Sequence, residues 1–175
     1  MRFVITGEWK QNRLLRLVIF LFLVFTTLFW LTNGLLYFHS MSLDPSSVVT
    51  HFLGKPDEYG GPAIARSYKI LLEISHAHLF AMGILVMTMT HLLLFVPAPG
   101  YLKAWFVIAT FVSALFDEAS GWLIVYVHEV FAWMKVASFV VFQVSLLAII
   151  VLLFLALLGK WRNAYTDSAK ATKAA

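Results

Sequence analysis

Four long apolar runs dominate this chain, and they constrain its fold more than any other feature. They cover approximately residues 14–38, 64–96, 102–120 and 130–158. An α-helix needs roughly 20 residues to cross a bilayer, and each run is about that long or longer. Runs of this length, separated by polar connections, predict an all-α integral membrane protein built as an up-down bundle of four helices.

Composition indicates the same class of protein. Hydrophobic residues occupy 61% of the 175 positions, charged residues occupy 13%, and the mean hydropathy is +0.85. A soluble domain of this length needs more polar surface. The absence of cysteine from the sequence excludes disulfides, thiolate nucleophiles and cysteine-ligated metal or c-type haem sites. The formal charge of +4, mostly near the ends, suits anionic lipid headgroups and not nucleic acid.

Basic residues indicate how the bundle is oriented. With four spans, most of them fall on one side of the membrane: Arg2, Lys10, Arg13, Arg16, Lys103, Lys160 and Arg162. Cytoplasmic loops are enriched in Lys and Arg, so both termini are expected in the cytoplasm, with residues 1–13 as an N-terminal segment and 159–175 as a polar tail. Lys55, Arg66 and Lys69 lie on the other side and act against this orientation. The expected location is a bacterial inner membrane, crossed several times.

The first outer loop contains a short predicted helix. Asp44 suits its N-cap, Pro45 its first turn and Gly54 its C-terminal stop. Its apolar residues are expected to lie on the membrane surface, which would make it an interfacial helix. They are Val48, Val49, Phe52 and Leu53.

Ionisable residues form a layer near the outer ends of the four runs. Counting helical rise places the following side chains at similar depth: His39, Glu73, His76, His78, Asp117, Glu118, His128 and Lys135. Such groups are costly in hydrocarbon and usually mark a functional site there. Random placement would divide them between the two faces of the membrane.

Several of the ionisable residues also have an ordinary structural explanation. A single histidine at a helix end is commonly solvated, which applies to His39 and His128. Asp117 or Glu118 could pair with Lys135 and fix the helix packing. His51 suits the polar face of the loop helix, and His91 lies near the opposite membrane face.

The leading prediction from this layer is haem b. Imidazole ligates haem iron, and a four-helix bundle holds cofactors between facing helices. His76 and His128 are the preferred axial pair, with His39 and His78 as substitutes. His76 and His78 stand about 200° apart on one helix, so both cannot face one iron. Side chains suited to the propionates or to the ring are Arg66, Lys69, Lys135, Phe80, Met82, Phe116, Trp122, Phe131 and Trp133.

The corresponding function is electron transfer between the quinone pool and a periplasmic cytochrome or larger redox complex, by a subunit that is not a self-contained enzyme. Quinone chemistry needs a proton acceptor beside an apolar slot, and Glu73, Asp117 and Glu118 are the candidates. Two alternatives stay open. One is a non-haem iron or zinc site built from Glu73, His76, His78, Asp117 and Glu118. The other is a cofactor-free anchor or assembly subunit of a respiratory complex.

Glu73, His76 and His128 also carry a family resemblance. The sequence E-I-S-H on the second span and a further histidine at the entry to the fourth resemble one half of the haem A synthase type of bundle. Small four-helix b-type membrane cytochromes share this general plan. The resemblance implies haem ligation by His76. This chain differs from many synthases in having one bundle where they have two and in lacking their cysteine pair.

Overall fold

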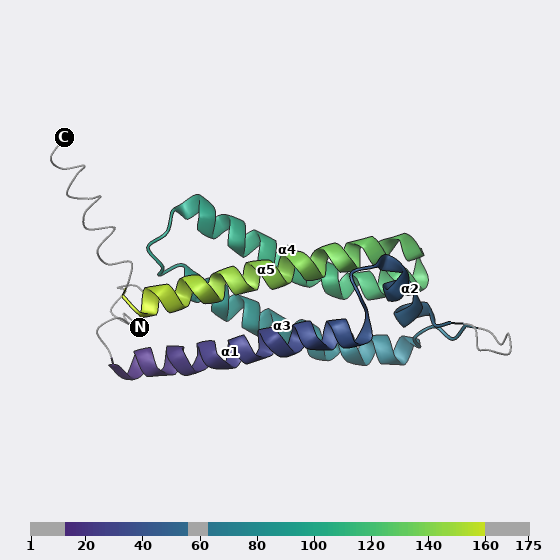
Figure 1. The fold of residues 1–175 in the computed structure, drawn as a ribbon, viewed down its shortest axis with the longest axis horizontal. Helices are drawn as coiled ribbons and strands as arrows, with labels where there is room; N and C mark the ends of the chain where they lie inside the picture. The colour runs from purple at the N-terminus through teal and green to yellow at the C-terminus, as the bar shows by residue number, and fades with distance from the viewer. Residues whose placement is uncertain (1–12, 56–62, 160–175) are drawn as a thin grey trace.

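The computed structural model describes residues 13–55 and 63–159, where all regular structure is helical (Figure 1). Four helices are long and apolar enough to cross a membrane, which confirms the predicted all-α membrane bundle. They are α1 (Arg13–Ser40), α3 (Tyr68–Leu93), α4 (Gly100–Tyr126) and α5 (Ala132–Leu157). The short α2 (Pro45–Leu53) follows α1, and a 3-10 turn, η2 (Glu129–Phe131), precedes α5. The predicted terminal segments 1–13 and 159–175 lie outside the described residues, apart from Arg13 and Gly159.

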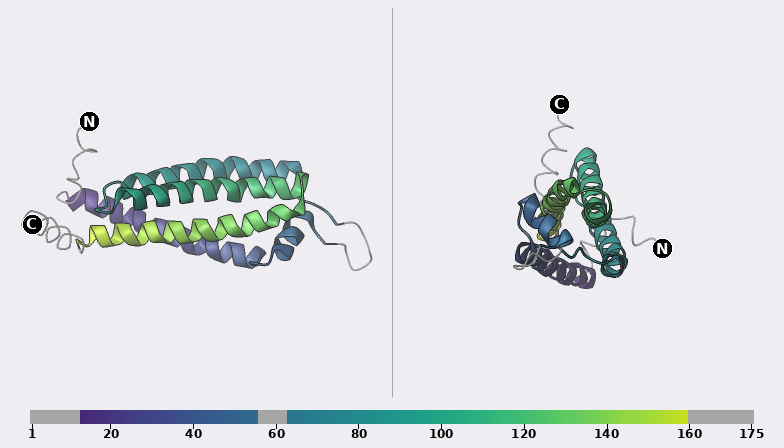
Figure 2. Two further views of the ribbon diagram at one scale, coloured as in Figure 1. Left: turned by 90° about the horizontal axis from the view of Figure 1, so that it is seen from above. Right: turned by 90° about the vertical axis from the view of Figure 1, so that its right-hand side faces the viewer.

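The bundle has up-down topology with α5 at its centre. Successive long helices run in opposite directions, and the first residues of α1 lie at the same end as the last residues of α5 (Figures 1 and 2). α5 packs against α1, α3 and α4, whereas α1 and α3 hardly touch each other. The main core is apolar and centres on α5; its members include Leu23, Val86, Met89, Leu146, Ile149 and Leu153.

The outer surface of the bundle is also apolar. Large hydrophobic side chains are exposed along every long helix. Exposed aromatic residues stand at both ends: Tyr101 and Trp105 at the start of α4, and Tyr126 and Trp133 at the turn between α4 and α5. Amphipathic aromatic rings favour the two membrane–water interfaces. The chain is therefore a multi-pass membrane protein.

α1 is fastened to α5 along its length. The Trp30 indole N–H donates to the Gln143 carbonyl at 2.9 Å, and the Tyr37 ring stacks on Phe139 with centroids 3.6 Å apart. At the other end, the Arg16 guanidinium donates at 3.4 Å to a carbonyl in the last turn of α5. These contacts hold α1 against α5 and leave its other side available to neighbours.

α4 is longer than predicted because Gly121 does not end it. The helix continues to Tyr126, six residues past the predicted end at residue 120, and Gly121 is buried within it. A Cβ at Gly121 would lie 2.9 Å from Cε1 of Phe52, a residue of α2. The glycine therefore serves close packing between α2 and α4. The second span is shorter than predicted, since α3 begins at Tyr68 and not at residue 64.

Enlarging Gly121 should loosen α2. We expect Gly121→Leu to lower the free energy of unfolding by about 1–3 kcal/mol, because overpacking must displace the Phe52 ring. Thermal unfolding in detergent measures this. Gly83→Leu is the matched control, since a Cβ at Gly83 meets nothing within 4 Å. Equal melting temperatures for the two variants would contradict this account of Gly121.

The predicted caps of α2 are confirmed. Asp44 Oδ1 accepts the backbone N–H of Ser46 at 3.2 Å. Gly54 ends the helix with a φ of 79°, in the left-handed region that favours glycine. A Cβ there would also lie 2.6 Å from the Ile64 carbonyl oxygen. The turn after α2 therefore requires glycine at this position.

The apolar face of α2 packs on the bundle and not on the membrane surface. Val48 is fully buried and Phe52 nearly so. They form a second small core with Leu71, Ile124 and Ala132. The expectation that these side chains lie on lipid is corrected accordingly, and α2 becomes a cover over one end of the four long helices.

Candidate functional site

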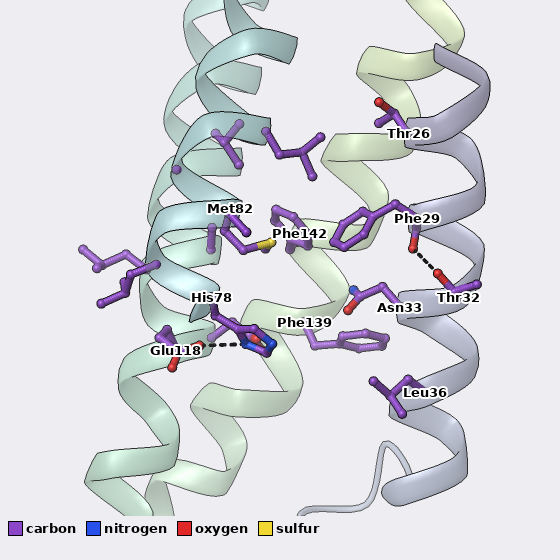
Figure 3. A pocket seen from close by; sticks show the side chains of 18 of the residues that line it. Thr26, Phe29, Thr32, Asn33, Leu36, His78, Met82, Glu118, Phe139 and Phe142 are labelled. Atoms are coloured by element: carbon purple, nitrogen blue, oxygen red, sulfur yellow. Dashed lines mark hydrogen bonds and ion pairs between the residues drawn. The ribbon is translucent and has the colours of Figure 1, made fainter. Parts of the chain in front are cut away.

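A groove of about 970 Å³ separates α1 from α3 (Figure 3). Phe139 and Phe142 of α5 lie between its two walls. Most of its lining is apolar, and wall residues such as Phe25 and Leu35 of α1 are 72% and 70% exposed. Because these side chains lie on the outer surface of a membrane bundle, the space opens sideways toward lipid. We refer to it as the lateral groove.

A histidine–glutamate pair lies at the α2 end of the lateral groove. His78 Nδ1 is 3.3 Å from Glu118 Oε2. The other carboxylate oxygen accepts the Ser75 hydroxyl at 2.6 Å, and Ser75 in turn accepts the Trp122 indole N–H at 2.7 Å. This chain of hydrogen bonds fixes the Glu118 carboxylate, whose side chain is only 15% exposed. A fixed carboxylate orients the imidazole and stabilises its protonated form.

The opposite wall presents polar and aromatic groups at a similar level. Asn33 of α1 points into the space between the helices, and the Phe139 ring lies close to it (Figure 3). His39, in the last turn of α1, also lines the groove. Polar groups thus face each other across one end of an otherwise apolar slot.

A second space of about 330 Å³, with a more polar lining than the groove, adjoins the groove beneath α2. We call it the α2 chamber. Residues common to both linings include Asn33, His78, Asp117, Glu118 and Phe139. The histidine–glutamate pair therefore stands at the boundary between an apolar space that faces lipid and a polar space that faces α2.

An ion pair lines the chamber. Lys135 Nζ donates to Asp117 Oδ2 at 2.9 Å and to the Asp117 carbonyl at 3.0 Å. The side chains are 13% and 26% exposed. This confirms the predicted interhelical pair between α4 and α5. Asp117 Oδ1 is buried, and the residues that the structure describes provide no hydrogen-bond partner for it.

A second cation, Arg66, lies at the α2 side of the chamber. It donates to His51 Nε2 and, at 3.4 Å, to the His51 carbonyl, and its guanidinium lies 5.2 Å from the centre of the Phe52 ring. Since arginine only donates, His51 Nε2 must accept, so the imidazole is neutral. Burial and the charges of Arg66 and Lys135 lower the pKa of His51 below its ordinary value of 6.5.

Acidification should therefore weaken the contact between α2 and the bundle. His51 binds a proton more readily unfolded than folded, so its contribution to stability is present above pH 6.5 and is lost as the pH falls toward its folded pKa. We expect unfolding curves recorded between pH 7.5 and about pH 5 to show this loss. His51→Gln keeps a hydrogen-bonding side chain but cannot titrate, so its curve should be flatter. A slope identical to that of the parent chain would contradict the assignment.

The structure brings some of the predicted site residues together. His39 and His78 line the lateral groove, Asp117 and Glu118 line both spaces, and Arg66 and Lys135 line the chamber; of the predicted ring-lining side chains, Met82 lines the groove and Trp122 the chamber. The predicted side chains Lys69, Phe80, Phe116, Phe131 and Trp133 line neither space, and three of the predicted catalytic or ligating residues also stand apart. Glu73 pairs with Lys69 on the exposed face of α3 at 3.7 Å, and His76 is exposed on α3. His128 caps η2, where its Nδ1 accepts the Val130 N–H at 3.0 Å.

The predicted axial pair His76 and His128 thus does not share either space. No group of three or more His, Asp or Glu side chains within residues 13–55 and 63–159 is arranged to hold a metal ion. The residues searched include Glu73, His76, His78, Asp117 and Glu118, from which an iron or zinc site was predicted.

Sequence reasoning missed two residues that shape the site, Ser75 and Asn33, and predicted a different role for Trp122. Ser75 and Trp122 support Glu118, and Asn33 faces the groove. Helical spacing could have indicated the first two roles, because Ser75 is three residues before His78 and Trp122 is four residues after Glu118. For Asn33, the polar amide within an apolar run was itself the signal.

Comparison with known proteins places the chain in a structural class. The model of a family described as a transmembrane helical domain, Aq_1264_TM, matches residues 42–164. The match therefore includes α2 to α5 and begins after α1. Searches of curated proteins and of solved structures found no match.

Proposed function

The chain belongs to this family of transmembrane helical domains, and we propose that it is a redox subunit that binds a lipid-soluble quinol in the lateral groove. One observation carries the proposal. A hydrogen-bonded histidine–glutamate pair closes the polar end of an apolar groove that is open to lipid. A quinol likewise has a polar end, a ring with two hydroxyl groups, and an apolar end, an isoprenoid tail.

The groove residues match the parts of such a ligand. Phe139 and Phe142 offer aromatic faces to the ring, and the apolar walls of α1 and α3 suit the tail. His78 and Asn33 offer hydrogen-bonding groups from opposite walls. An entrance from lipid lets the ligand reach its site without crossing water.

The histidine–glutamate pair would accept protons as the quinol is oxidised. Oxidation of one quinol to quinone releases two electrons and two protons. One hydroxyl proton passes to Nε2 of His78, and the Glu118 carboxylate at Nδ1 stabilises the imidazolium. The second proton follows by the same route after the imidazolium has passed the first to water. The electrons pass to one-electron carriers, of the haem or iron–sulfur class, on a partner subunit or a periplasmic cytochrome. In this scheme Glu118 acts through His78, while Asp117 holds Lys135.

The positions of several cations support an orientation. Arg13 and Arg16 lie at the end of the bundle away from α2, and Lys103 lies near the start of α4 at that same end. Cytoplasmic ends are enriched in such residues. We therefore propose that α2 and the chamber face the periplasm of a bacterial inner membrane.

Photocrosslinking tests the proposal. The protein in lipid nanodiscs is irradiated with a quinone analogue that carries a photoreactive group on its tail, and the labelled peptides are sequenced. We expect labels on the groove-facing residues of α1 and α3 that an excess of unlabelled quinone suppresses. A headgroup-free analogue with the same tail should give weaker and non-competable labelling. Labelling spread evenly over the lipid-facing surface of α4 would refute the site.

Haem b is the second candidate, favoured by a separate observation. His39 and His78 line the groove from facing helices, and the carboxylate at His78 Nδ1 leaves Nε2 available, as in many ligating histidines. Arg66 and Lys135 in the adjoining chamber would suit the propionates. Absorption spectra of haem-replete protein, oxidised and reduced, test this. A Soret band lost in His39→Ala and His78→Ala but kept in His76→Ala and His128→Ala would favour haem in the groove.

A further inference from the structure

We infer that the α2 chamber is a water-filled route by which protons leave the His78–Glu118 pair for the surface covered by α2. The inference rests on the proposed function only for the origin of the protons. Access of water to the chamber is a property of the protein alone, and it is tested below without any quinol.

The chamber has the walls and the size of a hydrated space. Its lining carries Ser40, His51, Arg66, Asp117, Glu118 and Lys135 beside apolar side chains such as Phe52, Leu71 and Ile74, and a larger share of its surface is polar than in the groove. A volume of 330 Å³ holds about ten water molecules at roughly 30 Å³ each. Polar cavities of this kind retain water, whereas apolar ones stay dry.

The titratable groups of the chamber extend from the groove to α2. His78 and Glu118 stand at the boundary with the groove, Asp117 and Lys135 line the chamber, and His51 with Arg66 lies beside α2. The two cations balance the two carboxylates, so no net fixed charge opposes a mobile proton. The Tyr37 side chain also lines the chamber, and its hydroxyl donates a hydrogen bond to the Ser42 carbonyl at 3.4 Å.

The other directions offer no comparable exit within the described part of the chain. Hydroxyl groups in the groove are tied to their own helix: Thr26 donates to the Phe22 carbonyl at 2.9 Å and Thr32 to the Leu28 carbonyl at 2.9 Å. Toward the opposite membrane face, the space between the helices is filled by the apolar core around α5. A proton released at His78 therefore has a polar path on one side only.

Cysteine accessibility tests the route, and the chain is suited to it because it has no cysteine of its own. Ile74→Cys probes the chamber wall, and Leu79→Cys, five residues along the same helix, probes the groove alone. The variants are reconstituted in vesicles of known protein orientation and treated with a charged, membrane-impermeant thiol reagent. We expect Ile74→Cys to react at least tenfold faster than Leu79→Cys, and only from the side of α2.

Two outcomes would overturn the inference. One is labelling of Ile74→Cys no faster than that of Leu79→Cys; the other is equal labelling from both sides of the membrane. Leu36→Cys, on the wall common to both spaces, serves as a second probe if Ile74→Cys does not fold. Ser40→Trp places a bulky ring on the chamber lining and should slow labelling of Ile74→Cys.

Failure of the route and failure of the proposed function give different results. Fast one-sided labelling without quinone crosslinking keeps the aqueous chamber and removes the quinol. Competable crosslinking with an unreactive chamber keeps the quinol site and requires protons to leave elsewhere.

Discussion

In the His78→Ala variant we expect the affinity for a quinol to fall about 10- to 150-fold. A hydrogen bond to a charged group contributes about 1.5–3 kcal/mol, which corresponds to that range. Alanine removes the imidazole from the boundary between groove and chamber and leaves Glu118 bonded to Ser75. Titration of the protein in nanodiscs with a short-tailed quinol, followed by tryptophan fluorescence, measures the change.

The chain provides a matched control for this prediction two residues away. His76 lies on the same helix at nearly the same depth but is exposed and lines neither of the two spaces. His76→Ala should therefore bind the quinol as the parent chain does. Equal losses in His76→Ala and His78→Ala would mean that the groove is not the binding site.

The Lys135→Met variant should be the least stable of the single substitutions considered. Removing one partner of a mostly buried ion pair leaves an uncompensated charge, which typically costs about 3–5 kcal/mol. Lys135 also donates to the Asp117 carbonyl, so a backbone bond is lost with the charge. Chemical unfolding in mixed micelles measures the loss.

Neutralising the partner should restore part of this stability. In Lys135→Met with Asp117→Asn, the buried carboxylate is replaced by an amide that needs no counter-ion. We expect the double variant to be more stable than Lys135→Met alone, a coupling that a double-mutant cycle quantifies. Additive losses would show that the two side chains act independently, against the 2.9 Å contact.

The depth of the polar residues could be predicted from the sequence, whereas their direction around each helix could not. Length and rise place His76, His78, Asp117 and Lys135 near one end, because a span has a known thickness. α3 is apolar on most of its circumference, so its pattern does not reveal which face meets α4 and α5. His76 and His78 differ by about 200° around the axis, and that angle separates a side chain outside both spaces from one that lines them.

The case of Gly121 shows a related ambiguity. A glycine in an apolar run can end a helix or make room for a neighbouring side chain, and the sequence alone does not distinguish these two roles. Only the position of α2, fixed by Phe52 in three dimensions, distinguishes them. The caps of α2 could be predicted, since Asp44 and Gly54 act through bonds to their own neighbours in the chain.

The attachment of α1 has a consequence for how a ligand and the fold support each other. The matched family region begins at residue 42, so one wall of the groove comes from a helix that precedes it and is held chiefly by α5. A molecule bridging α1 and α3 would add contacts where these helices now have few. Ligand binding would then be coupled to the packing of α1 on the bundle. At a ligand concentration one hundred times the dissociation constant, the free energy of unfolding would rise by about 2.7 kcal/mol. A ligand in the groove would thus help to hold α1 in place.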